Sequence, residues 1–465
     1  MKYVSTRGEA PALPFEDAML TGLARDGGLY VPEVWPVLDA DTMAGFTSAS
    51  YEEVAFQVIR PFLGDTFSDD EFREILSKAY GSFGHVCRCP LVQLNSAHFL
   101  LELFHGPTLA FKDVAMQLIG QMFQVALERR GERCTIVGAT SGDTGSAAIE
   151  AFRGLDAVDV FIMYPDGRVS DVQRRQMTTP AESNVHAIAV DGDFDDCQAL
   201  LKDMFNDFSF RDRVKLAGVN SINWARVVAQ IVYYFTAAVA VGAPKRKVSF
   251  TVPTGNFGDI FAGYAAKRMG LPIDRLVIAT NQNDILHRTL QSGDHSKAGV
   301  TPSISPSMDI QVSSNFERLV FELYDRSGNA VQELMRQLKA EGSFELSAAA
   351  LQRLRHEFDS GRCDEQQTAQ TIAQQYRETG EVLCPHTAVG VKVASDCLSS
   401  GETPMVTLAT AHAAKFPAAV ESACGVYPPL PDRMADLFDR PERITQVPND
   451  LQAVEALVLE RTGRS

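Results

Sequence analysis

Residues 101–113 read Leu-Glu-Leu-Phe-His-Gly-Pro-Thr-Leu-Ala-Phe-Lys-Asp, and this stretch decides the fold. A strand-like run, 98–104, ends in the turn residues Gly106 and Pro107, and a helical pattern of apolar residues begins at about Lys112. One lysine is therefore expected where a turn becomes a helix. Burial there would lower its pKa and make it a nucleophile or base, whereas a solvated first-turn lysine is the simpler interpretation of its position alone.

The composition is ordinary for a globular protein. The 465 residues are 45% hydrophobic and 22% charged, enough for two to three domains with a large core. The net charge of -16 argues against nucleic acid or an anionic membrane surface as the main partner. The longest apolar run, 231–242, is too short to span a bilayer. The first residues contain no apolar core and the eight cysteines are scattered, so we expect no export signal, reduced cysteines and a cytoplasmic protein.

We expect no metal site. The nearest candidate is the run His85-Val86-Cys87-Arg88-Cys89, which lacks the Cys-x-x-Cys spacing and has no second pair of ligands elsewhere.

Strand and helix patterns alternate from about 98 to 280. Strands are predicted at 133–139, 158–163, 185–190, 214–219, 247–252 and 275–280, and a further one at 404–409. Continuous apolar strands joined by helices predict an α/β fold with mostly parallel sheets covered on both faces. The active site of such a sheet lies beyond the carboxyl ends of its strands. Two helices are predicted within 51–80, and a mostly helical insertion at about 325–380.

Two turns at predicted strand ends could hold anions. Residues 138–145, Gly-Ala-Thr-Ser-Gly-Asp-Thr-Gly, and residues 253–259, Pro-Thr-Gly-Asn-Phe-Gly-Asp, both lie between a strand and a helix. Backbone N–H groups at a helix start favour a carboxylate or a phosphate, although glycine in such turns also has purely steric causes. Neither turn has Rossmann or Walker A spacing.

A lysine, two anion-binding turns and the hydroxyl of Thr410 at a later strand end suit one cofactor, pyridoxal phosphate. The lysine would meet its aldehyde, a glycine turn its phosphate and the hydroxyl its ring nitrogen.

Several long motifs in the right order resemble the threonine synthase family, of the longer bacterial and fungal type. The resemblance runs from Tyr3 to about Tyr427 and includes the motifs Phe-His-Gly-Pro-Thr-x-Ala-Phe-Lys-Asp, Ser-Gly-Asp-Thr-Gly, Thr-Gly-Asn-Phe-Gly-Asp, Ser-Pro-Ser-Met-Asp-Ile, Cys-Pro-His-Thr-Ala and Ala-Thr-Ala-His-x-Ala-Lys-Phe. It implies a fold-type II pyridoxal-phosphate enzyme, similar to the tryptophan synthase β chain. The implied reaction converts O-phospho-L-homoserine and water into L-threonine and phosphate.

The resemblance also assigns residues. Lys112 matches the Schiff-base lysine, and Thr410 matches the hydroxyl that faces the pyridine nitrogen. The loop around the cofactor phosphate matches Gly255, Asn256, Phe257, Gly258 and Asp259, and the turn that grips the substrate carboxylate matches Ser141, Asp143 and Thr144. Asp143 would repel a carboxylate unless it bonds to something else. Arg318 and Lys415 are candidates for the substrate phosphate, or for structural ion pairs.

The implied domain organisation has four parts. They are an N-terminal segment, 1–95, a large domain, 96–113 with 242–430, a small α/β domain, 114–241, and a C-terminal tail, 431–465. We expect a monomer or a homodimer.

Three alternatives remain open at this stage. The chain could be a dehydratase or a cysteine-synthase-like enzyme on the same cofactor, a non-catalytic relative that binds a phosphorylated ligand, or a nucleotide-binding enzyme. The absent Walker lysine and Rossmann spacing oppose the last of these.

Overall fold

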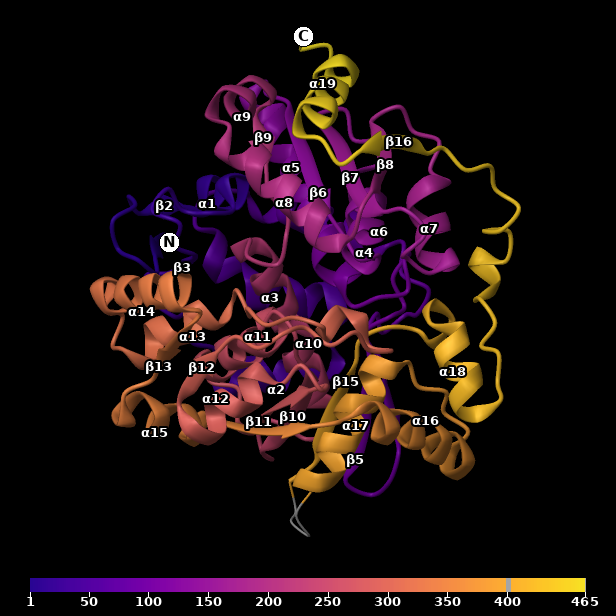
Figure 1. The fold of residues 1–465 in the computed structure, drawn as a ribbon. Helices are drawn as coiled ribbons and strands as arrows, with labels where there is room; N and C mark the ends of the chain where they lie inside the picture. The colour runs from indigo at the N-terminus through magenta and orange to yellow at the C-terminus, as the bar shows by residue number, and fades with distance from the viewer. Residues whose placement is uncertain (399–402, 465) are drawn as a thin grey trace.

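Two mostly parallel sheets organise the chain in the computed structural model, which describes residues 1–398 and 403–464 (Figure 1). The larger sheet has the order β14-β11-β10-β15-β5-β4, and its neighbours are parallel except for β4 and β5. Its strands are β4 (Leu91–Gln93), β5 (His98–Glu102), β10 (Val248–Pro253), β11 (Ile273–Thr280), β14 (Phe358–Arg362) and β15 (Met405–Ala409).

The smaller sheet is fully parallel, with the order β16-β8-β7-β6-β9. Its strands are β6 (Cys134–Ala139), β7 (Val158–Pro165), β8 (Val185–Asp191), β9 (Leu216–Ala217) and β16 (Thr445–Pro448). The helices that follow these strands are α6 (Asp143–Phe152), α7 (Asp171–Thr178), α8 (Phe194–Asn206), α9 (Phe208–Val214) and α19 (Leu451–Thr462). The predicted α/β class with parallel sheets is confirmed.

Long buried helices lie between the sheets and cover them. These are α5 (Lys112–Arg130), α10 (Trp224–Ala240), α11 (Gly258–Arg268) and α17 (Pro385–Cys397). Helix α10 is apolar on almost all of its faces, and nearly every one of its residues is buried. The apolar run at 231–242 is therefore largely part of a buried helix. Helix α5 packs closely on α6, since a Cβ added at Gly120 would lie 2.3 Å from the Ala151 carbonyl oxygen.

The N-terminal segment forms a small antiparallel sheet and several helices. Its elements are β1 (Lys2–Ser5), β2 (Leu13–Pro14), α1 (Phe15–Thr21), β3 (Tyr30–Pro32), α2 (Ala40–Gly45), η1 (Phe46–Ser48), α3 (Tyr51–Leu63) and α4 (Asp69–Tyr80). The two helices predicted within 51–80 are therefore confirmed. Arg7 ties the segment to α13 through an ion pair of 3.0 Å with the buried carboxylate of Glu317.

The region after β11 contains more than the helices predicted for it. It comprises α12 (Ile285–Ser292), β12 (Asp294–Ser296), η2 (Pro306–Met308), α13 (Phe316–Leu323), α14 (Gly328–Glu341), β13 (Ser343–Glu345), α15 (Ala348–Glu357) and α16 (Glu365–Thr379). In addition, β14 lies within it and forms the edge of the larger sheet beside β11. The insertion thus contributes a strand to the larger sheet, although its charged sequence predicted only helices.

The C-terminal residues cross from one sheet to the other. After β15 come η3 (Ala413–Lys415), α18 (Pro417–Cys424) and η4 (Asp432–Met434). The yellow segment in Figure 1 then runs along the side of the molecule to the smaller sheet, where β16 pairs with β8. Val447, Val454 and Val458 are buried there. Within the segment 431–465, expected as a tail, β16 thus completes the smaller sheet and α19 packs beside it.

The order of strands brings distant segments to one edge. Strands β11, β10, β15 and β5 are parallel neighbours, so the loops after them leave from the same side of the larger sheet. Those loops contain the Lys112 stretch, the 253–259 turn and Thr410. No helix in the described part of the chain has both the length and the apolar character needed to cross a membrane.

Candidate active site

The loop before Lys112 is closed by the residue after it. The Asp113 carboxylate accepts hydrogen bonds from the Thr108 N–H (2.8 Å) and the Thr108 hydroxyl (2.6 Å). Gly106 makes room for this arrangement, because a Cβ there would lie 2.4 Å from the Asp113 Cβ. Leu109 adopts a φ of 63°, a conformation that side chains rarely take and that the closed loop enforces. The loop therefore fixes where α5 begins and where Lys112 points.

Lys112 is buried and faces a carboxylate. Its residue is 8% exposed, and its Nζ lies 3.4 Å from Oδ2 of Asp143, the first residue of α6. Burial lowers the pKa of the Lys112 amine, the charge of Asp143 opposes this shift, and the charges of Lys415 and Arg226 add to it. The net direction is downward, which increases the fraction of neutral, nucleophilic amine.

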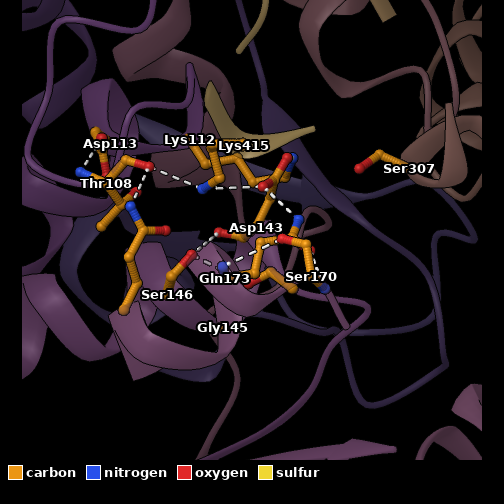
Figure 2. A network of polar contacts seen from close by, with 12 residues as sticks. Thr108, Lys112, Asp113, Asp143, Gly145, Ser146, Ser170, Gln173, Ser307 and Lys415 are labelled. Atoms are coloured by element: carbon orange, nitrogen blue, oxygen red, sulfur yellow. Dashed lines mark hydrogen bonds and ion pairs between the residues drawn. The ribbon is translucent and has the colours of Figure 1, made fainter. Parts of the chain in front are cut away.

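Asp143 is the centre of a buried polar cluster (Figure 2). Its Oδ1 pairs with Nζ of Lys415 at 3.0 Å and accepts a hydrogen bond of 2.9 Å from the Gln173 amide. Lys415 is fully buried and also donates to the Thr108 carbonyl oxygen at 2.8 Å. Burial alone would raise the pKa of the Asp143 carboxyl, but the charges of Lys415 and Lys112 outweigh it and hold that pKa well below its usual value. The negative charge of Asp143 is thus offset by the positive charges of its neighbours.

The turn before α6 presents its main chain to the same space. Gly142 has a φ of 134°, and a Cβ there would overlap the Gln173 side chain at 2.3 Å. The Thr140 hydroxyl accepts hydrogen bonds from the N–H groups of Gly142 and Gly145, each at 2.9 Å, which sets the curvature of the turn. Ser141 and Thr144 flank Asp143 and are half-buried. The start of α6 therefore lies beside Lys112, and the first N–H groups of a helix have no partner within the helix itself.

The second turn, 255–259, follows β10 and begins α11. Phe257 caps the helix with a φ of 65°, and its ring packs against Phe316 and Phe358. A Cβ at Gly255 would lie 2.8 Å from the Ser307 carbonyl oxygen, so the turn requires glycine there. The Ser313 hydroxyl donates to the Gly255 carbonyl oxygen at 2.7 Å. With Asn256 exposed and Gly258 half-buried, the N-terminus of α11 is left open to an anion.

Thr410 is brought beside Lys112 by the main chain. The Phe111 N–H donates to the Thr410 carbonyl oxygen at 2.8 Å, and Ala110 forms an antiparallel bridge with Ala411. Thr410 is 6% exposed and directly follows β15. Lys112, the 253–259 turn and Thr410 thus lie at the carboxyl ends of the larger sheet's strands, and Lys112 meets the 138–145 turn of the smaller sheet through Asp143.

The residues fit pyridoxal phosphate. A buried amine with a lowered pKa suits its aldehyde, and the Gly255 turn, whose space a Cβ would fill, suits its phosphate. The buried amine thus matches the cofactor's aldehyde, and the Gly255 turn matches its phosphate.

Comparisons with known proteins agree along the whole chain. Residues 2–80 match the family model "Threonine synthase N terminus", residues 83–335 match "Pyridoxal-phosphate dependent enzyme", and residues 387–458 match "Threonine synthase, C-terminal". A threonine synthase of Pseudomonas aeruginosa is 55% identical, with 100% of this chain and 99% of that protein covered. The chain belongs to the threonine synthase family.

Solved structures of the threonine synthase family superpose on almost the entire chain. The pyridoxal-phosphate-bound enzyme of Brucella melitensis is 58% identical with a TM-score of 0.97, covering 99% of each chain. The yeast enzyme is 38% identical with a TM-score of 0.94, covering 100% of this chain and 99% of that one. The protein is therefore a pyridoxal-phosphate-dependent lyase with the fold-type II architecture, as the sequence motifs indicated.

Arg318, one candidate for the substrate phosphate, is enclosed within the threonine synthase fold. It is 0% exposed, and its guanidinium donates to the Tyr30 carbonyl oxygen (3.0 Å), the Ile222 carbonyl oxygen (2.5 Å) and the Asn315 side chain. Asn315 in turn donates to the Asn256 carbonyl oxygen at 3.1 Å. Arg318 therefore supports the 255–259 turn from behind and does not face a ligand.

Arg318→Lys is expected to lower the free energy of unfolding by about 3 kcal/mol, because a single ammonium leaves buried carbonyl groups unpaired at about 1–3 kcal/mol each. Urea denaturation measures this change. The matched control is Arg336→Lys, whose side chain is 63% exposed and whose substitution should leave the midpoint unchanged. Equal effects at the two positions would contradict a supporting role for Arg318.

The Asp259 side chain is directed under the turn. Its Oδ1 accepts hydrogen bonds from the Tyr233 hydroxyl (2.5 Å) and the Tyr234 hydroxyl (3.0 Å), both on α10. Burial raises the pKa of its carboxyl to about 6, while the two tyrosine hydrogen bonds and the charge of Lys112 oppose this. The Asp259 main-chain N–H is then the group that can meet a phosphate.

The raised pKa of Asp259 predicts a pH-dependent stability. The folded state binds this proton more tightly than the unfolded state does, so stability is lost as the pH rises from about 4 through about 6. Relative to Asp259→Asn, the wild type should lose up to about 3 kcal/mol across this window, since one pKa unit corresponds to about 1.4 kcal/mol. Urea titrations at pH 4 to 7 measure both proteins. Parallel pH curves would contradict the assignment.

Gln173 carried no recognisable signal in the sequence; it comes from α7 and donates to Asp143. Thr108 stands in the quoted motif Phe-His-Gly-Pro-Thr-x-Ala-Phe-Lys-Asp, and its carbonyl oxygen accepts a hydrogen bond from Lys415. His386 stands in the quoted motif Cys-Pro-His-Thr-Ala, and burial lowers the pKa of its imidazole to about 4. Only the motif's presence in the family-like pattern could have drawn attention to it.

Proposed function

We propose that the protein acts on O-phospho-L-homoserine and water and releases L-threonine and phosphate, with Lys112 as the residue that holds the cofactor and moves protons. The observation that carries this is the buried Lys112 amine beside Asp143, at the carboxyl ends of the larger sheet's strands. Family membership supports the reaction, and the geometry supports the roles of the residues.

Lys112 is suited to proton transfer. When bound, pyridoxal phosphate holds the substrate's amino group and accepts the electrons released from its Cα–H bond. With its lowered pKa, Lys112 Nζ would take the Cα proton, pass it on, and then take a Cβ proton as phosphate leaves from Cγ. Of these two protons one goes to Cγ and the other to the departing phosphate. Water then adds its hydroxyl to Cβ and its second proton to Cα. Asp143 remains ionised beside it and holds the ammonium form while the proton is stored.

The remaining residues bind and orient. The N–H groups at the start of α6, with the hydroxyls of Ser141 and Thr144, would hold the substrate carboxylate. The 255–259 turn would hold the cofactor phosphate at the start of α11, and Thr410 would face the pyridine nitrogen. Lys415 supplies a fixed buried cation 3.0 Å from Asp143 Oδ1. The burial of Lys112, Asp143 and Lys415 keeps bulk water from their charges, which strengthens their interactions.

A coupled assay tests the substrate assignment. Purified holoenzyme with O-phospho-L-homoserine should release phosphate and form threonine in equal amounts. Ketoacid formation from threonine, without phosphate release from phosphohomoserine, would instead indicate a dehydratase. A protein that binds phosphohomoserine without turnover would be the non-catalytic relative. The cytoplasmic location, the domain boundaries and the monomer or homodimer state stay predictions.

A further inference from the structure

His386 lies between the two anion-binding turns. It is in the first turn of α17 and is 3% exposed, and its ring packs against Phe416 at a centroid distance of 4.8 Å. Its Nε2 accepts a hydrogen bond of 3.2 Å from the Ser307 N–H, and the Ser307 carbonyl oxygen lies against Gly255. The charges of Asp143, Lys112 and Lys415 also act on the His386 imidazole. One imidazole thus connects the 255–259 turn with the Asp143 cluster.

The hydrogen bond from Ser307 decides the tautomer. A ring nitrogen that accepts carries no proton, and burial keeps this imidazole neutral because its pKa falls to about 4. The proton must then be on Nδ1. Nδ1 is buried and has no hydrogen-bond partner among the described residues. A buried donor without an acceptor is costly, so this N–H is prepared for an acceptor that arrives with a ligand.

The surroundings select the kind of acceptor. The buried Lys415 ammonium and a helix N-terminus favour an anion, and the Ser307 loop contacts the turn that suits a phosphate. Lys112 and Gln173 already satisfy Asp143. We propose that the Nδ1–H of His386 donates a hydrogen bond to a phosphoryl oxygen, that of the cofactor or that of the substrate's leaving phosphate. The inference rests on the proposed function for the identity of these groups.

A matched pair of substitutions separates the two ring nitrogens. In His386→Asn the amide NH2 lies where Nδ1 lay, so the variant keeps the N–H donor. In His386→Gln the amide lies where Nε2 lay, so the variant keeps only the acceptor for the Ser307 N–H. His386→Gln should therefore weaken phosphoryl binding by about one to two orders of magnitude, the value of a hydrogen bond to a charged acceptor. His386→Asn should bind nearly as the wild type does. His98→Gln, a buried histidine at the other end of β5, is the control for packing.

Two binding measurements on the holoenzyme distinguish the sources. A faster loss of cofactor from His386→Gln on dilution, followed by the visible absorption, assigns the hydrogen bond to the cofactor phosphate. Weaker binding of inorganic phosphate, with threonine binding unchanged, assigns it to the leaving phosphate. If the Gln and Asn variants behave alike in both measurements, or if only threonine binding changes, the proposal is wrong.

A measurement on the wild type does not depend on the variants folding. In holoenzyme labelled with ¹⁵N-histidine, Nδ1 of His386 should carry the proton at neutral pH, and its resonance should shift when phosphate is added or the cofactor is removed. A proton on Nε2, or a resonance that neither change affects, would overturn the proposal. Wild-type holoenzyme that releases no phosphate from phosphohomoserine would instead refute the proposed function, independently of His386.

Discussion

Replacing Lys112 with alanine is expected to abolish threonine formation. A positioned base alone contributes about 10²–10⁴-fold, and Lys112 is also the residue expected to hold the cofactor, so the loss should exceed that range. Phosphate release and threonine production measure the activity, and the visible absorption of bound cofactor measures its attachment. The fold should persist, because Lys415 and Gln173 still neutralise and bind Asp143.

Two variants make this prediction specific. Lys112→Arg keeps the cation beside Asp143 but removes the nucleophilic amine, so it should be as inactive as the alanine variant while its stability stays closer to the wild type. Lys78→Ala, at a side chain 60% exposed, should be fully active. Threonine formed by either Lys112 variant would refute the assignment of this residue.

Local patterns located most of the elements that form the site. The apolar run at 247–252 corresponds to β10, and the change of pattern at Lys112 marks the true start of α5. These signals succeed because a buried strand and an amphipathic helix are determined by neighbouring residues. The glycine turns were also recognisable, since a turn between a strand and a helix is itself a local feature.

Other parts depend on contacts between distant residues. Strand β14 reads Phe-Asp-Ser-Gly-Arg, which has no apolar pattern, and it is a strand because β11 lies beside it. The burial of Lys415 and the enclosure of Arg318 follow from packing against Thr108, Tyr30 and Ile222, none of which is near in sequence. Motif resemblance named Asp143 as a site residue, but only the fold showed why a carboxylate is tolerated there.

Replacing Asp143 with asparagine is expected to be the most destabilising change at the site. It leaves the Lys112 and Lys415 ammonium groups buried without their anion, and removing one partner of a buried ion pair costs about 3–5 kcal/mol. Gln173 also loses a charged acceptor. Urea denaturation of the Asp143→Asn variant should show this loss at neutral pH. Because the pKa of Asp143 is depressed, the difference from wild type should be complete above about pH 4, the ordinary pKa of an aspartate, and should shrink progressively as the pH falls below it.

A double-mutant cycle tests whether Asp143 and Lys415 act as one unit. Lys415→Met alone leaves the Asp143 carboxylate without its closer cation, whereas the double variant removes both charges. The loss of unfolding free energy in the double variant should therefore be about 1–3 kcal/mol smaller than the sum of the two single losses. The exposed pair Lys78–Glu74, 2.7 Å apart, is the control and should show almost no coupling. Strict additivity at Asp143 and Lys415 would mean that the cluster does not hold its charges by mutual neutralisation, and the account of how Asp143 tolerates a substrate carboxylate would fail with it.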